Sequence, residues 1–369
     1  MKAIAVRPGV KRSARLVDRP VPRILAADEV KAKVLHVGVC GTDRDEIEGG
    51  RAKPPEGSED LVIGHEMLGQ VVEIGGAVQG VRPGDRVVFT VRRGCGRCRP
   101  CRLGRSDLCR TGLYRERGIW GLDGYQTEFA VEREQNVVHV PDAAGRAAVL
   151  TEPLSIVEKV IEEMIRVQAN RLPDWSRGEA PLRGRHCLVA GLGPVGLLAA
   201  LVLHLRGAEV FGLDILDADA ARPRWLASIG GTYIDGREVP PDRLDEKIGA
   251  MNMIVEATGV PGLALNLLDA LDRDGIYGLT GIPDGAGLIR VPGAELMRQL
   301  VLQNQVMMGS VNASKSHFAA AVADLALAER VLPGKCDEMI TGSVPFDRFE
   351  DAFDNPSADS IKTLIDWNP

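Results

Sequence analysis

The chain has 369 residues, of which 45% are hydrophobic and 26% charged, and its formal net charge is −6. This length exceeds the usual size of one hydrophobic core and predicts two domains of a soluble globular protein. The acidic balance gives no general attraction to nucleic acid or to an anionic membrane, so we expect neither as a partner. Charges run through residues 1–17, which argues against a secretory signal, and seven cysteines without such a signal favour a reducing, cytoplasmic location.

The first 155 residues or so carry the pattern of short β-strands. Residues 30–40 alternate between apolar and polar positions and are followed by a turn at Gly41. Residues 67–90 contain two β-rich runs around the turn signals GG and RPGD, and residues 125–141 contain two more. Many short strands at this spacing predict a β-rich barrel or sandwich.

The pattern changes from β to helical at Ser155. Ser155 and Glu158 have the spacing of a capping box, and apolar residues then recur with helical periodicity to residue 165. We therefore expect a helix that begins at Ser155 and leads into a second domain. Residues 171–185 are rich in turn-forming residues and predict a connector.

From residue 186 apolar strands alternate with helical patterns, which predicts an α/β domain with a doubly wound parallel sheet. Within it, residues 187–205 carry no Asp, Glu, Lys or Arg and are long enough to span a bilayer. Three glycines and a proline interrupt the first half of this run. A buried strand, a turn and a buried helix therefore explain it better than a membrane span.

A glycine-rich turn stands between that strand and that helix. Its sequence is Gly191-Leu-Gly193-Pro194-Val195-Gly196, the G-x-G-x-x-G pattern of dinucleotide-binding domains. The first glycine makes the tight turn, the second lets the backbone approach a pyrophosphate, and the third lets the helix pack on the strand. The N-terminus of the helix then offers free N–H groups to the phosphates.

An acidic residue follows at the distance expected for recognition of the ribose. Asp214 ends the next apolar strand, 18 residues after Gly196. A carboxylate there accepts hydrogen bonds from the ribose hydroxyls and repels the 2′-phosphate of NADP. Ile215 and Leu216 follow, with no arginine to bind that phosphate, so NAD is favoured over NADP.

Four cysteines, Cys95, Cys98, Cys101 and Cys109, fall within fifteen residues. Four thiolates can close a tetrahedral shell around Zn²⁺ and leave no position for substrate, which favours a structural zinc site. An iron–sulfur cluster is the rival interpretation. Seven arginines between residues 92 and 110 also leave open a zinc ribbon that binds nucleic acid, although the charge of the whole chain opposes it.

Further possible metal ligands are dispersed along the chain. Cys40 ends a predicted strand, His65 and Glu66 are adjacent, and Glu152 lies near the expected domain boundary. Taken singly, each has an ordinary structural explanation, such as a core cysteine or a surface glutamate before proline.

Together these motifs resemble the zinc-containing medium-chain dehydrogenases and reductases. The general resemblance is carried by CGTD (40–43), GHEMLGQVVEIG (64–75), PGDRV (83–87), the four cysteines and GLGPVG. A narrower resemblance, to the glucose dehydrogenase branch of archaea and bacteria, is carried by RERGIWGLDGY (115–125), TEPLSIVEK (151–159), GSVNASKSHFAAAVADL (309–325) and ADSIKTLIDW (358–367).

The resemblance implies a specific domain organisation. A GroES-like catalytic domain would comprise residues 1–155, with the structural zinc lobe at 92–110, and would be completed by residues 310–369. A Rossmann domain for NAD would occupy residues 156–309. Members of this family are commonly dimers or tetramers, so we expect a homo-oligomer by analogy.

The resemblance also implies residue roles and two zinc ions per chain, one catalytic and one structural. The catalytic zinc set would be Cys40, His65, Glu66 and Glu152. Thr42 matches the family's hydroxyl residue near the substrate oxygen, and Asp45 lies where some relatives carry a histidine that relays the proton. Glu116 and Asn312, together with Glu152, would contact the sugar, and Thr258 and Asn312 would contact the cofactor.

The implied reaction is oxidation of an aldose, D-glucose first, at C1 to the lactone, with hydride transfer to NAD⁺. Many members of the branch carry an Asn-Arg-Arg-type sequence after the second Rossmann strand and accept NADP, whereas this chain has Asp214 there. A polyol, alcohol or threonine dehydrogenase with the same general motifs is the close alternative. A non-catalytic nucleotide-binding protein is a more distant one, because the zinc ligands are present.

Overall fold

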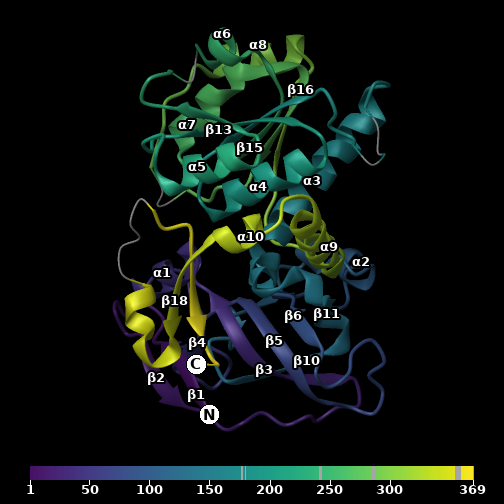
Figure 1. Ribbon diagram of the computed structural model, residues 1–369, viewed down its shortest axis with the longest axis vertical. Coiled ribbons are helices and arrows are strands. Elements are labelled where there is room, and N and C mark those ends of the chain that lie inside the picture. Colours follow the sequence, from purple (N-terminus) through teal and green to yellow (C-terminus); the bar gives the residue numbers. More distant parts are fainter. Residues whose placement is uncertain (176–177, 179, 241–242, 284–286, 354–358, 369) are drawn as a thin grey trace. The chain divides into compact units, whose positions relative to one another are not determined.

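The computed structural model describes residues 1–369 except 176–177, 179, 241–242, 284–286, 354–358 and 369. The chain divides into two compact units. The first combines Met1–Ser155 with Asn312–Pro369, and the second is Ile156–Val311. Figure 1 shows purple N-terminal strands and yellow C-terminal elements in the same unit.

The first unit is built mainly from antiparallel sheets. Its strands are β1 (Lys2–Val6), β2 (Arg15–Asp18), β3 (Glu29–Gly38), β4 (Leu61–Val62), β5 (Glu66–Ile74), β6 (Arg86–Phe89), β7 (Arg92–Arg93), β8 (Arg115–Arg117), β9 (Gly121–Leu122), β10 (Phe129–Arg133), β11 (Val137–Val140), β18 (Ile340–Pro345) and β19 (Lys362–Asp366). Its helices are α1 (Gly41–Ile47), α2 (Arg99–Arg102), α9 (Lys315–Val331) and α10 (Lys335–Glu338), with 3₁₀ turns η1 (Ser106–Leu108), η2 (Glu134–Asn136), η3 (Asp142–Ala144), η4 (Arg146–Leu150) and η7 (Phe346–Ala352).

The central sheet of this unit has seven strands in the order β11-β6-β5-β3-β19-β18, with β10 paired to β3. Smaller sheets have the orders β2-β1-β4 and β7-β8-β9. Strand β3 alternates buried and partly exposed residues along much of its length, as a strand with one face on a core should. The core itself includes Ile4, Val34, Met67, Phe89 and Tyr125.

The second unit contains a six-stranded parallel sheet. Its strands are β12 (His186–Ala190), β13 (Glu209–Asp214), β14 (Thr232–Asp235), β15 (Met251–Glu256), β16 (Leu271–Leu279) and β17 (Val306–Gly309). Its helical elements are α4 (Pro194–Leu205), α5 (Ala221–Ser228), α6 (Leu244–Ile248), α7 (Pro261–Asn266), η6 (Leu267–Ala270) and α8 (Gly293–Leu302), together with most of α3 (Thr151–Arg171).

All five strand pairings of this sheet are parallel, and the spatial order is β14-β13-β12-β15-β16-β17. This is the 3-2-1-4-5-6 order of the Rossmann fold, whose switch point lies between β12 and β15. The predicted class, a β-rich domain plus a doubly wound parallel sheet, is confirmed. The uncharged run 187–205 forms β12, the turn and α4, and no described helix is long and apolar enough to cross a membrane.

The predicted helix start at Ser155 is wrong, because α3 begins four residues earlier, at Thr151. The 3₁₀ turn η4 leads directly into the helix, and Pro153 sits in the first turn, where its missing N–H is not needed. The Ser155 hydroxyl donates to the Glu152 carbonyl oxygen at 2.6 Å, so it bonds to the preceding turn instead of capping the helix.

Candidate active site and metal centres

Cys40, His65 and Glu66 come together in the first unit from two separate segments. Their ligand atoms all lie within 4.8 Å of one another, and Cys40 Sγ is 3.1 Å from His65 Nε2. Cys40 is the N-cap of α1 and accepts a hydrogen bond from the Thr42 backbone N–H, while Glu66 opens β5 directly after His65. Sulfur, nitrogen and carboxylate oxygen form the donor set of a catalytic zinc site that retains an open position.

The surroundings of His65 also fit a bound metal. His65 is buried, and its Nδ1 has no hydrogen-bond partner among the described residues, although Asp43 Oδ1 lies 3.7 Å away. Burial alone would lower the pKa of His65, but Cys40 and Asp43 raise it well above its usual value. Burial raises the pKa of the Cys40 thiol. A cation at this point would favour the thiolate and the neutral imidazole that ligate metals.

Glu152, the fourth expected ligand, lies outside that compact group. It sits in the first turn of α3, where burial raises its pKa to about 7 against the opposing influence of His65. Glu152 is therefore influenced by the charge of His65 but is not one of the three residues whose ligand atoms lie within 4.8 Å of one another. Thr42 is the second residue of α1, two residues after Cys40. Asp45 Oδ2 accepts from the Arg51 backbone N–H at 3.0 Å, a contact that closes the turn after α1.

Lys362 is a buried neighbour of the candidate metal ligands that the sequence analysis did not identify. It lies on β19, is 1% exposed, and forms an ion pair with Glu66, which is equally buried. Glu66 and Cys40 raise the pKa of Lys362 against the effect of its burial. In the sequence Lys362 stands within ADSIKTLIDW, a stretch that carries the narrower resemblance, but no local spacing connects it with Glu66.

Glu116 and Asn312, the expected sugar contacts, are brought together across 196 positions of the chain. Asn312 Nδ2 donates to Glu116 Oε1 at 2.8 Å, and Asn312 adopts a left-handed backbone with φ of 60°. Glu116 is buried on β8 and also accepts hydrogen bonds from the buried guanidinium of Arg92. The turn after β8 lies against the segment before His65, since a Cβ added at Gly118 would lie 2.4 Å from the Gly64 carbonyl oxygen.

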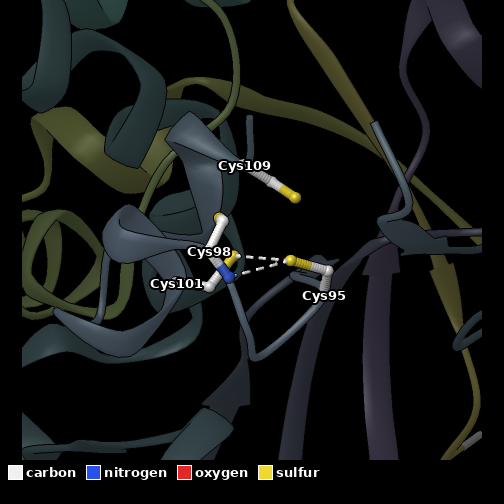
Figure 2. A group of neighbouring side chains, drawn as sticks. All are labelled: Cys95, Cys98, Cys101 and Cys109. Atoms are coloured by element: carbon white, nitrogen blue, oxygen red, sulfur yellow. Dashed lines mark hydrogen bonds between the residues drawn. The ribbon is translucent and has the colours of Figure 1, made fainter. Parts of the chain in front are cut away.

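The four clustered cysteines converge on a common point, as Figure 2 shows. Their sulfur atoms lie within 4.8 Å of one another, and all seven cysteines of the chain are free thiols. Cys98 is the N-cap of α2, and its backbone N–H donates to Cys95 Sγ at 3.4 Å. Hydrogen bonds, first from Thr111, lower the pKa of Cys95 to about 5, which favours the thiolate. This arrangement fits a closed four-thiolate zinc site.

The glycine-rich turn of the second unit has the form expected for a pyrophosphate cradle. A Cβ at Gly196 would lie 1.8 Å from the Gly191 carbonyl oxygen, so only glycine permits this packing of α4 on β12. A Cβ at Gly193 would meet nothing within 4 Å, so the backbone is open there to a ligand. Gly193 is the N-cap of α4 and Pro194 its first residue.

Asp214 and Thr258 both lie at this turn. Asp214 Oδ2 accepts from the Leu192 backbone N–H at 2.6 Å, and Oδ1 accepts from the Ile215 backbone N–H at 2.7 Å. A Cβ at Gly191 would lie 2.8 Å from Thr258 Cγ2, which places Thr258 beside the first glycine. The expected cofactor residues of this unit are therefore gathered at one end of the parallel sheet.

Comparison with known proteins covers both units. Residues 26–142 match the alcohol dehydrogenase GroES-like domain, and residues 145–367, more than half of the chain, match the glucose dehydrogenase C-terminus. The chain is 38% identical to a glucose 1-dehydrogenase of Methanocella arvoryzae over 99% of each chain, and 40% identical to one of Thermoproteus tenax over 96% of each. It is similar to the solved structure of Haloferax mediterranei glucose dehydrogenase in complex with NADP, Zn and gluconolactone, with a TM-score of 0.89 and 32% identity over 100% of both chains.

Proposed function

The chain belongs to the zinc-containing medium-chain dehydrogenase/reductase family, in its glucose dehydrogenase branch, and is a nicotinamide-dependent dehydrogenase of CH–OH groups; from this premise we propose that it oxidises an aldose, D-glucose first, at C1. The products are the lactone and the reduced nicotinamide, formed by hydride transfer from C1 and release of the hydroxyl proton. The observation that carries the proposal is the convergence of Cys40, His65 and Glu66 in one unit with the Glu116–Asn312 pair.

Cys40, His65 and Glu66 would hold the catalytic zinc, with Glu152 at its margin. A zinc ion held there would supply Lewis acidity and would lower the pKa of the C1 hydroxyl. The Thr42 hydroxyl, two residues after Cys40, accepts the proton of that hydroxyl and passes it outward. The Asp43 carboxylate accepts a hydrogen bond from the Cys40 backbone N–H at 2.8 Å. It thereby fixes the start of α1, where Cys40 is the N-cap and Thr42 the second residue.

Glu116 and Asn312 orient the sugar. A site whose buried polar groups need the substrate's hydroxyls discriminates strongly against analogues that lack them. Glu116 Oε1 is already held by Arg92 and Asn312, so the carboxylate is fixed before the substrate arrives. This preorganisation reduces the entropic cost of positioning C1.

Gly191, Gly193 and Gly196 would bind the cofactor pyrophosphate, and Asp214 would bind the adenosine ribose, with NAD preferred over NADP. The preference is supported by the Asp214 carboxylate beside the glycine turn and by the exposed apolar side chain of Ile215, which follows it. Arg237 is held by the carboxylates of Asp235 and Asp217 and is thereby neutralised as a partner for a 2′-phosphate. We also propose a second, structural zinc at the four-cysteine lobe.

A substrate and cofactor panel tests the proposal. D-glucose, D-galactose, D-xylose, sorbitol, ethanol and L-threonine are each offered with NAD⁺ and NADP⁺, and the absorbance of the reduced nicotinamide is followed. The expected outcome is the highest kcat/KM for an aldose with NAD⁺, together with the lactone as product. A higher kcat/KM for sorbitol, ethanol or threonine would instead assign the chain to one of the related dehydrogenase activities.

A further inference from the structure

Arg51 reaches from the turn after α1 to the carboxylate of Glu116. Its Nη2 donates to Glu116 Oε2 at 3.0 Å, and its guanidinium lies over the Trp120 ring, 5.3 Å from the centroid. The side chain is nevertheless 54% exposed, whereas that of Glu116 is 3% exposed. Within the described part of the chain, Nε and Nη1 of Arg51 make no hydrogen bond, so several of its N–H groups are available to a ligand.

The two oxygens of Glu116 are engaged very differently. Oε1 accepts three hydrogen bonds, from Arg92 Nε at 3.1 Å, Arg92 Nη2 at 2.9 Å and Asn312 Nδ2 at 2.8 Å. Among the residues that the structure describes, Oε2 accepts a hydrogen bond only from Arg51. A carboxylate oxygen has about two lone-pair sites, so Oε2 keeps acceptor capacity, and it keeps it beside a half-exposed guanidinium.

The fold ties this pair to the candidate metal site from both sides. The Arg51 backbone N–H is bonded to Asp45 at the end of α1, the helix that starts at Cys40. The segment after Arg51 runs along the turn after Glu116, because the Lys53 N–H donates to the Ile119 carbonyl oxygen at 3.1 Å. The same turn packs through Gly118 on Gly64, the residue before His65.

We propose that Arg51 is a specificity-determining residue that contacts the sugar together with Glu116 Oε2; this inference rests on the proposed oxidation of an aldose. A hydroxyl group is both a donor and an acceptor, so a hydroxyl at this pair donates to Oε2 and accepts from the guanidinium. A second hydroxyl on the neighbouring carbon of the sugar can accept a hydrogen bond from another N–H of the Arg51 guanidinium. A methylene in the same place would leave both charged partners without a hydrogen bond, which is costly where one of them is buried.

A purely structural role for Arg51 accounts less well for its position. Glu116 is already neutralised by the buried Arg92, whose Nη1 is fixed on the Asp107 carbonyl oxygen at 2.9 Å and whose guanidinium stacks on Tyr114. Removing Arg51 therefore leaves Glu116 paired. The indole of Trp120 holds the arginine over the carboxylate and limits its freedom, which lowers the entropic cost of the contact with substrate.

The test compares the wild type with Arg51→Ala and Arg51→Lys on D-glucose, 2-deoxy-D-glucose and 3-deoxy-D-glucose. Loss of one charge-assisted hydrogen bond predicts that Arg51→Ala raises KM for glucose about 10- to 100-fold, with kcat changed less than about 3-fold. The preference of the wild type for glucose over one of the deoxy sugars should shrink. Arg51→Lys keeps the charge but loses the planar fork, so its KM should be intermediate.

Arg82→Ala is the matched control, since Arg82 is an exposed arginine of the same unit whose one ion pair among the described residues is the local one with Asp85. It should match the wild type in every constant. NADH binding and melting temperature, measured for each variant, show whether folding is intact; if Arg51→Ala does not fold, Arg51→Lys carries the test alone. An unchanged KM, or an undiminished preference for glucose, overturns the role of Arg51 while glucose oxidation stands. Failure of the wild type to oxidise any aldose would remove the proposed function itself.

Discussion

Lys362 on β19 forms an ion pair with Glu66 on β5, and both side chains are almost completely buried. The two strands do not pair with each other, because β3 lies between them in the sheet. Lys362 therefore reaches across β3, where a Cβ at Gly38 would lie 2.1 Å from Glu66 Oε2 and 2.9 Å from Lys362 Cε. Because Gly38 has no side chain, Glu66 and Lys362 can form their ion pair over the backbone of β3.

Replacing Lys362 by methionine should destabilise the first unit. The change leaves the Glu66 carboxylate buried without its partner, which costs about 3 to 5 kcal/mol. We expect this loss in urea unfolding of the EDTA-treated protein at pH 7. The double variant Glu66→Gln/Lys362→Met should recover most of it, and Lys2→Met, which breaks an exposed pair with Asp18, should cost about 1 kcal/mol or less. Equal stability of the single and double variants would contradict the ion-pair account.

Glu46 should make the stability of the protein fall with rising pH. Burial, and then the charge of Asp43, raise its pKa to about 9, and neither carboxyl oxygen has a hydrogen-bond partner among the described residues. The pKa of Glu46 in the folded state lies above the unfolded value of about 4.3, so the folded protein keeps a proton that the unfolded chain releases. The contribution of Glu46 to the free energy of unfolding is complete below about pH 4. It is lost as pH rises towards 9, by about 1.4 kcal/mol per pH unit.

Glu46→Gln should therefore remove about 3 kcal/mol of the decrease in unfolding free energy between pH 6 and pH 8. The measurement is urea unfolding at several pH values. Glu48→Gln, at the half-exposed position that follows α1, is the control and should keep the slope of the wild type. A Glu46→Gln slope identical to that of the wild type would show that Glu46 ionises normally.

Replacing Cys98 by serine should remove one of two zinc ions per chain and lower the melting temperature. The four-thiolate shell is expected to be closed to substrate, so turnover should fall only as far as folding does. Zinc is counted by elemental analysis and turnover at a temperature where the variant is folded. Cys336→Ser, a buried thiol outside both metal sites, should keep two zinc ions. Full stability with lost turnover would show that the lobe acts in the reaction.

The double variant Asp214→Ala/Ile215→Arg should shift the cofactor preference towards NADP. It removes a carboxylate that repels the 2′-phosphate and adds a guanidinium that can bind it. The ratio of kcat/KM for NADP⁺ and NAD⁺ measures the effect, and we expect a rise of about 100-fold or more, the size of two charge-assisted contacts. Because Asp214 also accepts two backbone hydrogen bonds at the glycine turn, Asp214→Asn is the control for local packing. An unchanged ratio would move ribose recognition to another residue.

The arrangements that the sequence anticipated are those set by short-range geometry; the ligands that they would hold stay predictions. Gly191, Gly193 and Gly196 are separated by a few residues, and their roles follow from the backbone of a single turn. The four cysteines are similar, because a loop of fifteen residues can close on one metal without help from the rest of the fold. In both cases the spacing alone restricts the structure to a few arrangements.

The features that it missed depend on strand order. No local pattern connects Lys362 with Glu66 or Arg51 with Glu116. The first pair is brought together by the pairing of β19 with β3, and the second by the contact between the segment after Arg51 and the turn after Glu116. The start of α3 was misplaced for a different reason. Ser155 and Glu158 have the spacing of a capping box. The preceding apolar turn η4 is already helical, however, so α3 continues from it and begins before Ser155.

The position of β19 in the central sheet has a consequence for biosynthesis. The ribosome completes residues 156–311 before it makes β18 and β19, so the parallel sheet of the second unit can fold while the seven-stranded sheet still lacks two strands. Until β19 docks against β3, the Glu66 carboxylate lacks its ion pair with Lys362, and β3 keeps an unpaired edge at residues 36–38. The first unit therefore completes its fold late, after the second unit has been synthesised. Chaperone protection during translation should matter most for residues 1–155, which leave the ribosome first.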